Sequence, residues 1–281
     1  MIKVAILGIA GSMGRASAKA ILDDDVLELS CGVDPKYKGD GVSAIAELGS
    51  DEITIHDSIE RIKQVDIDVC LDFTNAQSAY SNALFCAQNA INIVIGTSGL
   101  DEERVQTLRV AFEKSSSKCL VVPNFALGAV LMMRFAQIAS QWMDRAEIIE
   151  LHHDRKLDSP SGTSIATARG MGNKTGQDGK QEGFESQSQP SILELQGSNS
   201  IETIEGARGA LGPNSVRIHS VRLPGLLAHQ EVILSSLGES LTIRHDSYDR
   251  SSFMPGVLLA LKSVSNLESS LTVGIDSLLG L

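Results

Sequence analysis

The alternation of strand and helix patterns over the first 125 residues limits the possible folds more than any other feature of this chain. Short apolar segments predict strands at 2–7, 27–33, 53–56, 67–73, 91–95 and 118–122. Helical patterns predict helices between them, among others at 13–23, 76–89 and 101–116. Such alternation is typical of parallel strands joined by helices, so it predicts an α/β fold with a doubly wound sheet.

The first predicted strand runs into a glycine-rich turn. Gly8, Gly11 and Gly14 follow Val4-Ala5-Ile6-Leu7, and a helical pattern begins at Met13. Asp34 ends the next strand, 20 residues after Gly14, where an acid would meet the ribose hydroxyls of a dinucleotide. The spacing is G-x-x-G-x-x-G. A plain turn whose glycines only allow close packing is therefore the alternative to dinucleotide binding.

Three further strand ends carry polar turn sequences. They are Asp72-Phe73-Thr74, Gly96-Thr97-Ser98-Gly99 and Pro123-Asn124-Phe125. Ligands of a doubly wound sheet bind beyond the carboxyl ends of its strands, so all three should face the same crevice as the glycine turn. Ordinary turn chemistry is the alternative for each of them.

The pattern changes after residue 125 and predicts a second, α+β domain. Helices are expected at 127–143 and about 161–171, and strands at 146–152, 201–205, 215–223, 229–236 and 240–246. Consecutive strands with short turns indicate a mixed or antiparallel sheet. Residues 172–200 are polar and predict an exposed excursion. We assign 1–125 plus 252–281, which includes a last helix at 252–265, to a dinucleotide-binding domain, and 126–251 to a substrate-binding and oligomerisation domain.

Residues 150–163 combine proton-transfer groups with an anion-binding turn. His152, His153 and Lys156 end a strand pattern, and Ser161-Gly162-Thr163 begins a helix. A helix N-terminus has free N–H groups and a dipole that favours negative charge. On a straight strand His152 and Lys156 would lie about 13 Å apart, with His153 on the other side. The chain must therefore bend after the strand if these side chains are to share a ligand, and the motif predicts an anionic substrate that accepts a proton.

Composition excludes several classes of protein. The formal net charge of −11 argues against general nucleic-acid binding. No apolar stretch reaches the ~18 residues that a membrane span needs. The chain enters its first strand at once, which leaves no room for a targeting peptide. Four cysteines without a C-x-x-C pair indicate buried, reduced thiols. We therefore expect a cytoplasmic protein.

Together these motifs closely resemble one family over the whole chain, the 4-hydroxy-tetrahydrodipicolinate (dihydrodipicolinate) reductases of the diaminopimelate route to lysine. The most specific part is Glu150-Leu151-His152-His153 with Lys156, Asp158 and Pro160-Ser161-Gly162-Thr163. Many bacterial members have Gly-Val-Asn after Asn-Phe. Gly128-Ala129-Val130 and the segment 244–253 instead resemble the cyanobacterial and plant branch.

The resemblance implies a Rossmann-type domain joined to a substrate domain, and reduction of 4-hydroxy-tetrahydrodipicolinate to tetrahydrodipicolinate with NADPH or NADH. It implies that His152 and Lys156 are catalytic and that His153, Lys156, Ser161, Gly162 and Thr163 bind the dicarboxylate substrate. The cofactor would be bound by Gly8, Ile9, Ala10, Gly11, Ser12, Met13, Asp34, Phe73, Thr74, Gly96, Thr97, Ser98, Pro123, Asn124, Phe125 and Ala126. The family also implies a homo-oligomer, a tetramer or a dimer. From the charge, the hydropathy and the scattered histidines and cysteines we expect no nucleic-acid, membrane or metal partner.

Three other functions remain open at this stage. The chain could be another Rossmann oxidoreductase acting on an imine or aldehyde derived from an amino acid. It could be a nicotinamide-nucleotide sensor without catalysis. A metal hydrolase would use its histidines (His152, His153, His219, His229 or His245), but adjacent histidines on a strand diverge and no H-x-x-x-H helix is present. Asp34 favours NADH, and Lys36, Lys38 and Arg15 could favour NADPH instead.

Overall fold

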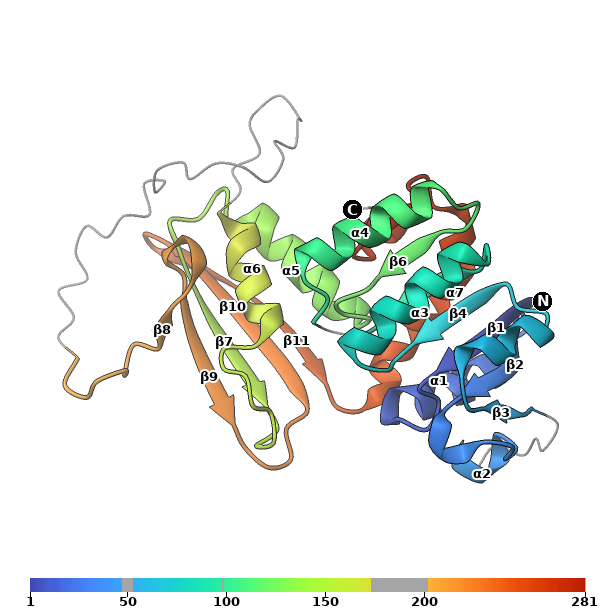
Figure 1. Cartoon of the computed structure of the whole chain (residues 1–281). Helices are drawn as coiled ribbons and strands as arrows, with labels where there is room; N and C mark the ends of the chain where they lie inside the picture. Colours follow the sequence, from blue (N-terminus) through green and yellow to red (C-terminus); the bar gives the residue numbers. More distant parts are fainter. Residues whose placement is uncertain (47–52, 98, 173–201, 281) are drawn as a thin grey trace. The chain divides into compact units, whose positions relative to one another are not determined.

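The structure is a computed structural model that describes residues 1–46, 53–97, 99–172 and 202–280. The chain forms two compact units, one of Met1–Leu127 with Arg250–Leu281 and one of Gly128–Asp249. Figure 1 shows the elements of both units. No described helix is both long enough and apolar enough to cross a membrane.

The first unit is built on a parallel sheet. Within the described residues its strand order is β12-β6-β5-β4-β1-β2-β3, and all neighbours are parallel. The strands are β1 (Ile2–Leu7), β2 (Leu27–Val33), β3 (Ile55–His56), β4 (Val69–Asp72), β5 (Asn92–Ile95), β6 (Cys119–Val121) and β12 (Leu271–Val273). Strand order reverses at β1, as in Rossmann-type folds. The predicted doubly wound sheet is confirmed.

Among the helices of this unit, α3 packs with α4, and α1 packs with both α7 and α2. Their bounds are α1 (Ser12–Leu22), α2 (Ser43–Ala46), α3 (Ala76–Gln88), α4 (Glu102–Glu113) and α7 (Met254–Ser263). Short 3-10 helices are η1 (Pro35–Tyr37), η2 (Ile59–Gln64), η4 (Arg250–Phe253), η5 (Val264–Asn266) and η6 (Asp276–Leu279).

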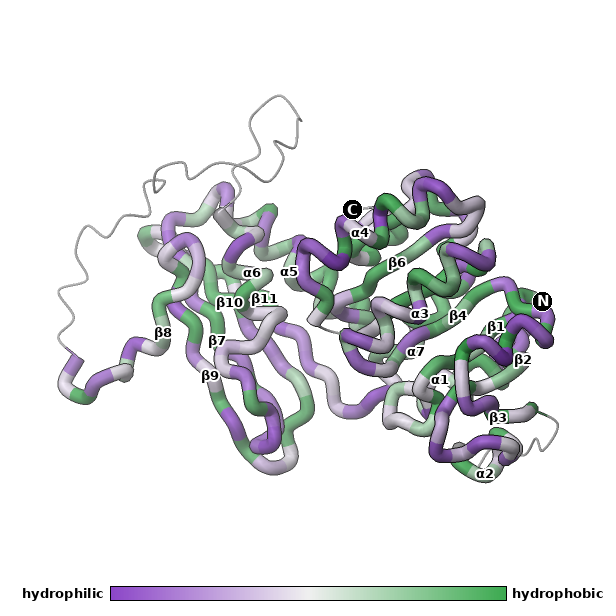
Figure 2. The backbone as a smooth tube through the Cα atoms, in the orientation of Figure 1, coloured by the Kyte–Doolittle hydropathy of each residue, from purple (hydrophilic) through white to green (hydrophobic). Residues whose placement is uncertain are grey.

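The core of this unit explains why its strands are almost uniformly apolar. Ala83 of α3 and Phe112 of α4 pack with alternate strand residues such as Leu7 and Ile95. The central strands are buried on both faces, and the tube in Figure 2 is largely hydrophobic along them. All four cysteines are buried and free, as predicted.

The second unit contains a mixed sheet with the order β11-β10-β7-β9-β8. Strand β7 pairs parallel with β9, and the other neighbours are antiparallel. The elements are α5 (Leu127–Ala139), β7 (Arg145–His152), α6 (Gly162–Met171), β8 (Ala210–Leu211), η3 (Pro213–Ser215), β9 (Arg217–Arg222), β10 (Ala228–Ser236) and β11 (Glu239–Ser247). This confirms the predicted α+β character.

Both α5 and α6 pack on one face of this sheet. Met132 of α5 and Ala168 of α6 form a core with Ile148, Ile218 and Val232 of the strands. Neighbouring strand residues point to opposite faces. Ile148, Ile218 and Val232 on the helix side are therefore buried, whereas Ile149 of β7, on the other face, is only half-buried.

One predicted strand is wrong. Residues 202–205 form bends and turns, and Ile204 is 75% exposed. The place beside β9 is taken by the short strand β8, which leaves the 202–205 segment without a sheet neighbour. The polar excursion predicted at 172–200 falls almost entirely outside the described residues.

Candidate active site

The glycine turn joins β1 to α1 and meets the strand end of β4. Gly8 has φ +80°, a conformation that suits glycine, and a Cβ there would lie 2.9 Å from the Phe73 carbonyl oxygen. A Cβ on Gly14 would lie 2.4 Å from the Gly8 oxygen. The Nε of Arg15 donates to the Ala10 oxygen at 2.8 Å. The glycines thus bring the N-terminus of α1 close to the turn, where backbone N–H groups are free for an anion.

The predicted cofactor residues of this unit gather at one edge of its sheet. Parallel strands place their carboxyl ends on the same edge, and the predicted turns follow β1, β2, β4, β5 and β6 there. Ile9 is fully buried, with its side chain against Gly32, so only its backbone is available to a ligand. Ser98 lies outside the described residues.

Asp34 follows β2 and caps the 3-10 helix η1. Its Oδ1 accepts from the Lys36 backbone N–H at 3.1 Å, which leaves Oδ2 for another donor. Lys38 forms an ion pair with Asp57 at 2.6 Å. One of the two lysines that could attract a 2′-phosphate is therefore already neutralised.

Two aromatic rings close over the turn after β5. Phe73 and Phe125 pack edge to face, with ring centroids 5.6 Å apart. A Cβ on Gly96 would lie 2.2 Å from the Phe73 ring and 2.6 Å from the Phe125 ring, so the packing requires glycine there. Asn124 holds the last turn by accepting from the Ala126 N–H at 2.9 Å. The structure thus brings together the turns after β4, β5 and β6.

In the second unit, a buried carboxylate organises the end of β7. Glu150 is fully buried, and its carboxylate accepts from Nδ1 of His152, two residues further along the strand. Arg222 of β9 binds the same carboxylate with both terminal nitrogens, at 2.7 and 2.8 Å. The Ser161 backbone N–H donates to it at 3.3 Å. His152, β9 and the start of α6 are thereby fixed to one group.

These contacts keep Glu150 ionised. Burial alone raises the pKa of Glu150, but hydrogen bonds from His152, Arg222 and Ser220 outweigh it and lower the pKa to about 2. A carboxylate can only accept hydrogen bonds, so His152 carries its proton on Nδ1 whether it is neutral or charged. Nε2 is then free to exchange a proton with a ligand. His152 itself is 15% exposed.

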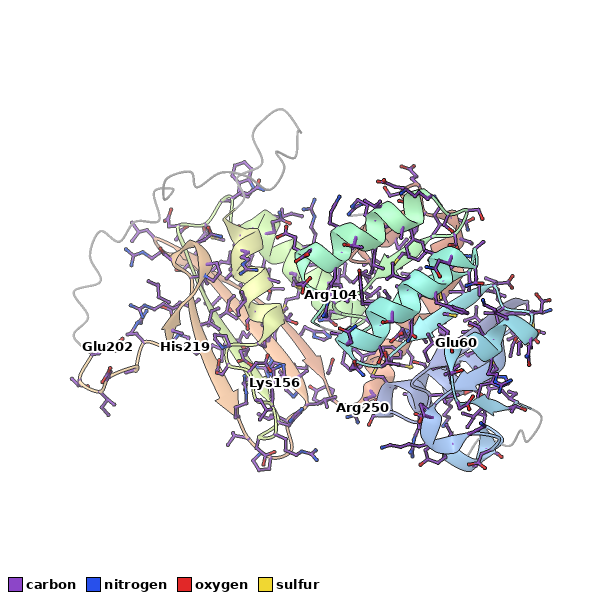
Figure 3. The ribbon with its side chains drawn as sticks, in the orientation of Figure 1. Glu60, Arg104, Lys156, Glu202, His219 and Arg250 are labelled. Atoms are coloured by element: carbon purple, nitrogen blue, oxygen red, sulfur yellow. The ribbon has the colours of Figure 1, made fainter. Side chains whose placement is uncertain are left out.

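The strand ends at His152 and the chain turns, as the spacing of the motif predicts. The Lys156 N–H donates to the His153 oxygen at 3.1 Å, which closes the turn. The Lys156 ammonium group binds both oxygens of Asp158, at 2.7 and 2.8 Å. Figure 3 labels Lys156 on this loop between β7 and α6. Arg222 also donates to the Asp158 carbonyl at 2.8 Å, which ties the loop to Glu150.

Helix α6 begins where the sequence predicts. Ser161 is its N-cap and accepts from the Ser164 N–H. The N–H and hydroxyl of Ser161 are both engaged inside the protein, and the residue is 2% exposed. Gly162 and Thr163 are more exposed, and their N–H groups have no carbonyl one turn earlier in the helix.

Three residues of the two units, Glu150, Asp72 and Arg222, make contacts at the candidate site but were not assigned a role from the sequence. Glu150 could have been found, because residues i and i+2 of a strand share a face. Asp72 stands in a quoted motif, but its contacts depend on the fold. Arg222 lies 72 residues from Glu150 and meets it only because β9 pairs with β7.

A parallel sheet of this order with a glycine turn at its switch point, joined to a second unit with a histidine site, defines the class of two-domain Rossmann-type oxidoreductases. Family models for the N- and C-terminal parts of dihydrodipicolinate reductase match residues 2–125 and 128–279. The chain belongs to the dihydrodipicolinate reductase family, whose members carry out an NAD(P)H-dependent reduction in lysine biosynthesis.

Individual relatives agree over the full length. Proteins named 4-hydroxy-tetrahydrodipicolinate reductase are 41% identical in Listeria welshimeri, over 99% of both chains, and 42% identical in the cyanobacterium Rippkaea orientalis, over 99% of this chain and 98% of the relative. A dipicolinate-bound dihydrodipicolinate reductase from Paenisporosarcina sp. TG-14 has a TM-score of 0.80 and 38% identity, with 99% of each chain covered. The amine dehydrogenase of Mycobacterium smegmatis, at 13% identity and TM-score 0.64, shares the fold alone.

Proposed function

We propose that this protein reduces 4-hydroxy-tetrahydrodipicolinate to tetrahydrodipicolinate, with the first unit binding NADH or NADPH and the second binding the dicarboxylate. The observation that carries the proposal is the hydrogen bond from His152 to the buried Glu150, beside the start of α6. It combines a proton donor with an anion-binding helix terminus. The relative from Paenisporosarcina, with dipicolinate bound, supports a planar dicarboxylate as ligand.

The first unit fits a dinucleotide. The close approach of Gly14 to Gly8 leaves the N-terminus of α1 open to a pyrophosphate, and Asp34 has a carboxylate oxygen to accept from a ribose hydroxyl. When bound, the nicotinamide supplies a hydride. Phe73, Thr74, Gly96, Thr97 and the turn at 123–126 would hold its ring end.

The second unit supplies the proton and neutralises the carboxylates. With Glu150 holding Nδ1, protonated His152 presents Nε2–H as a general acid, and Glu150 stabilises the imidazolium. Lys156 is the second proton-delivering group and a positive charge for a carboxylate. Its partner Asp158 is 59% exposed, and exposed ion pairs contribute little to stability. A substrate carboxylate can therefore take the place of Asp158 at small cost.

The anion-binding part consists of His153, Lys156 and the start of α6. Nδ1 of His153 is buried and has no hydrogen-bond partner among the described residues, which supports a role for this side chain in ligand binding. Gly162 and Thr163 offer free N–H groups, and Thr163 adds a hydroxyl. Ser161 belongs to the same turn, where it fixes the geometry through Glu150 and Ser164.

The direct test is an assay with freshly made 4-hydroxy-tetrahydrodipicolinate that follows the loss of absorbance of each reduced cofactor. We expect turnover with at least one of them. Activity that is absent with both NADH and NADPH, in folded protein, would exclude the proposed reaction.

The carboxylate assignment has its own test. Lys156→Ala should raise KM and lower kcat, because it removes both charge and a proton donor. Thr163→Val should mainly raise KM, by about 10- to 150-fold, the range for a hydrogen bond to a charged group. Pyridine-2,6-dicarboxylate should compete with substrate and bind both variants more weakly. Equal inhibition of wild type and both variants would show that the carboxylates bind elsewhere.

We further propose that the protein is a cytoplasmic homo-oligomer, a tetramer or a dimer. The face of the second sheet opposite α5 and α6 supports assembly, because half-buried apolar side chains lie on it among the charged pairs of Glu147 and Glu231. These apolar side chains are Ile149, Leu151, Val221 and Ile233. A second copy of this sheet would cover them.

A further inference from the structure

Asp72 is a fully buried carboxylate at the cofactor edge of the first sheet. It is the last residue of β4, and its own N-terminal neighbours belong to the core. Its backbone oxygen accepts from the Gly96 N–H at 2.9 Å, which joins the ends of β4 and β5. The carboxylate therefore lies directly beneath the two turns that would hold the nicotinamide.

The donors to this carboxylate are all uncharged. Oδ1 accepts from the Thr74 N–H at 2.8 Å, from the Thr74 hydroxyl at 2.6 Å and from the Thr97 hydroxyl at 3.2 Å. Oδ2 accepts from the Asn82 amide at 2.7 Å. Besides the two N–H groups, the carboxylate thus engages the hydroxyl hydrogens of two half-buried threonines in the proposed cofactor site.

The direction of those hydrogens has a chemical consequence. A hydroxyl has one hydrogen to donate and two lone pairs that accept. The Thr74 hydroxyl gives its hydrogen to Asp72 at 2.6 Å, because the other acceptor within reach, the Asn75 carbonyl, is 3.4 Å away. The Thr97 hydroxyl points its hydrogen at Asp72 too, either at Oδ1 or at the backbone oxygen 3.5 Å away. Both hydroxyls can then only accept hydrogen bonds from a ligand.

We propose that Asp72 is a positioning residue that makes Thr74 and Thr97 hydrogen-bond acceptors. The site then selects a ligand that carries an N–H donor. In the cofactor this donor is the primary carboxamide of the nicotinamide. This inference rests on the proposed function, because it assumes that the nicotinamide end of the cofactor binds at these turns. An oriented acceptor distinguishes –CONH2 from a group of the same shape without N–H. It also rejects a carboxylate, which would meet lone pairs and a buried negative charge.

The test compares the affinity of NADH with that of reduced 3-acetylpyridine adenine dinucleotide, in which a methyl group replaces the amide nitrogen. In calorimetry the wild type should prefer NADH by about 3- to 10-fold, the value of a neutral hydrogen bond. Asp72→Ala should bring the preference to within about twofold, because both threonine hydroxyls lose the carboxylate as acceptor and can turn their hydrogens towards the ligand.

Matched variants separate this role from a structural one. Asn82→Ala removes a donor to Oδ2 without touching either hydroxyl, so it should keep the preference. Thr74→Ser keeps a hydroxyl and should also keep the preference for NADH. Thr74→Val has no hydroxyl and should lose part of this preference. The threonine series decides the question if Asp72→Ala does not fold, as judged by its thermal unfolding.

The outcomes are distinct. A folded Asp72→Ala that binds both dinucleotides more weakly by the same factor overturns the inference, because that is the effect of a purely structural residue. A wild type that binds NADH well without preferring it to the acetyl analogue also overturns the inference, and leaves the proposed function intact. A wild type that binds neither NADH nor NADPH overturns the proposed function itself.

Discussion

At the scale of single residues, the chemistry depends on which atom of a side chain is left free. His152 has Nδ1 committed to Glu150, so Nε2 is the atom that can act on a substrate. Asp34 has one oxygen committed to the Lys36 N–H and the other free. The functions of His152 and Asp34 can therefore be tested by substitutions that remove the proton transfer or the hydrogen bonding of the free atom.

We expect His152→Gln to lower kcat by roughly 100-fold or more, the usual scale for loss of a general acid. Cofactor affinity should not change, because His152 belongs to the other unit. His219→Gln is the matched control. His219 also pairs with a carboxylate, Glu147 at 2.8 Å, but on the opposite face of the sheet. Near-native turnover of His152→Gln, measured at saturating substrate, would remove His152 from the mechanism.

Asp34 should decide between the two cofactors. Asp34→Ala should weaken NADH much more than NADPH, because the carboxylate accepts from ribose hydroxyls in one and repels the 2′-phosphate of the other. Asp34→Asn is the sharper variant, since its amide oxygen can still cap the Lys36 N–H. Calorimetry with both cofactors gives the comparison. Equal losses would mean that Asp34 does not contact the ribose.

At the scale of elements, strand pairing assembles the proton-transfer site. Arg222 stands opposite His152 in the β7–β9 pair, and its guanidinium reaches back to Glu150. The loop between β7 and α6 is held by the same arginine through Asp158. Glu150 thus connects two strands and a helix, and its ionisation should affect stability as well as catalysis.

The pH dependence follows from the low pKa of Glu150. Its pKa is about 2 in the folded protein against an ordinary 4.5, so the ionised form stabilises the fold above about pH 4.5 and this contribution is lost as pH falls towards 2. The difference in unfolding free energy between wild type and Glu150→Gln should therefore shrink by on the order of 3 kcal/mol from pH 5 to pH 2.

Urea unfolding at a series of pH values measures this difference. Glu147→Gln serves as the control, because Glu147 is 35% exposed and its ion pairs are weakened by solvent. Its effect on stability should vary less with pH. If the difference for Glu150→Gln is constant between pH 5 and pH 2, Glu150 does not ionise in the way the structure implies.

At the scale of the whole molecule, the half-buried face of the second sheet predicts assembly. Ile233→Glu places a second carboxylate beside Glu147, its cross-strand neighbour on this face, and should convert the oligomer to a monomer, because like charges without a partner are costly to bury. Leu237→Glu is the matched control, since Leu237 is fully exposed at the turn between β10 and β11. Light scattering on both variants gives the mass. An Ile233→Glu protein with the wild-type mass would place the interface elsewhere.

The sequence alone determined the features that rest on local patterns. Apolar runs at β1 and β4 predict buried strands, the glycines after β1 predict the turn, and Ser161 predicts the cap of α6. Each depends on residues close together in the chain, whose steric and hydrogen-bonding preferences act locally. The short β12 and β8, by contrast, carry too few residues for a pattern, and the 202–205 segment had a strand pattern without a place in a sheet.

Only the tertiary structure decided how the chemical groups are paired. Arg222 meets Glu150, and Thr97 meets Asp72, because strands distant in sequence pair side by side. These contacts set which nitrogen of His152 is free and which way the threonine hydrogens point. The sequence determines which side chains are present and which elements carry them. Their protonation and direction follow from burial and from partners that only the completed fold brings within hydrogen-bond distance.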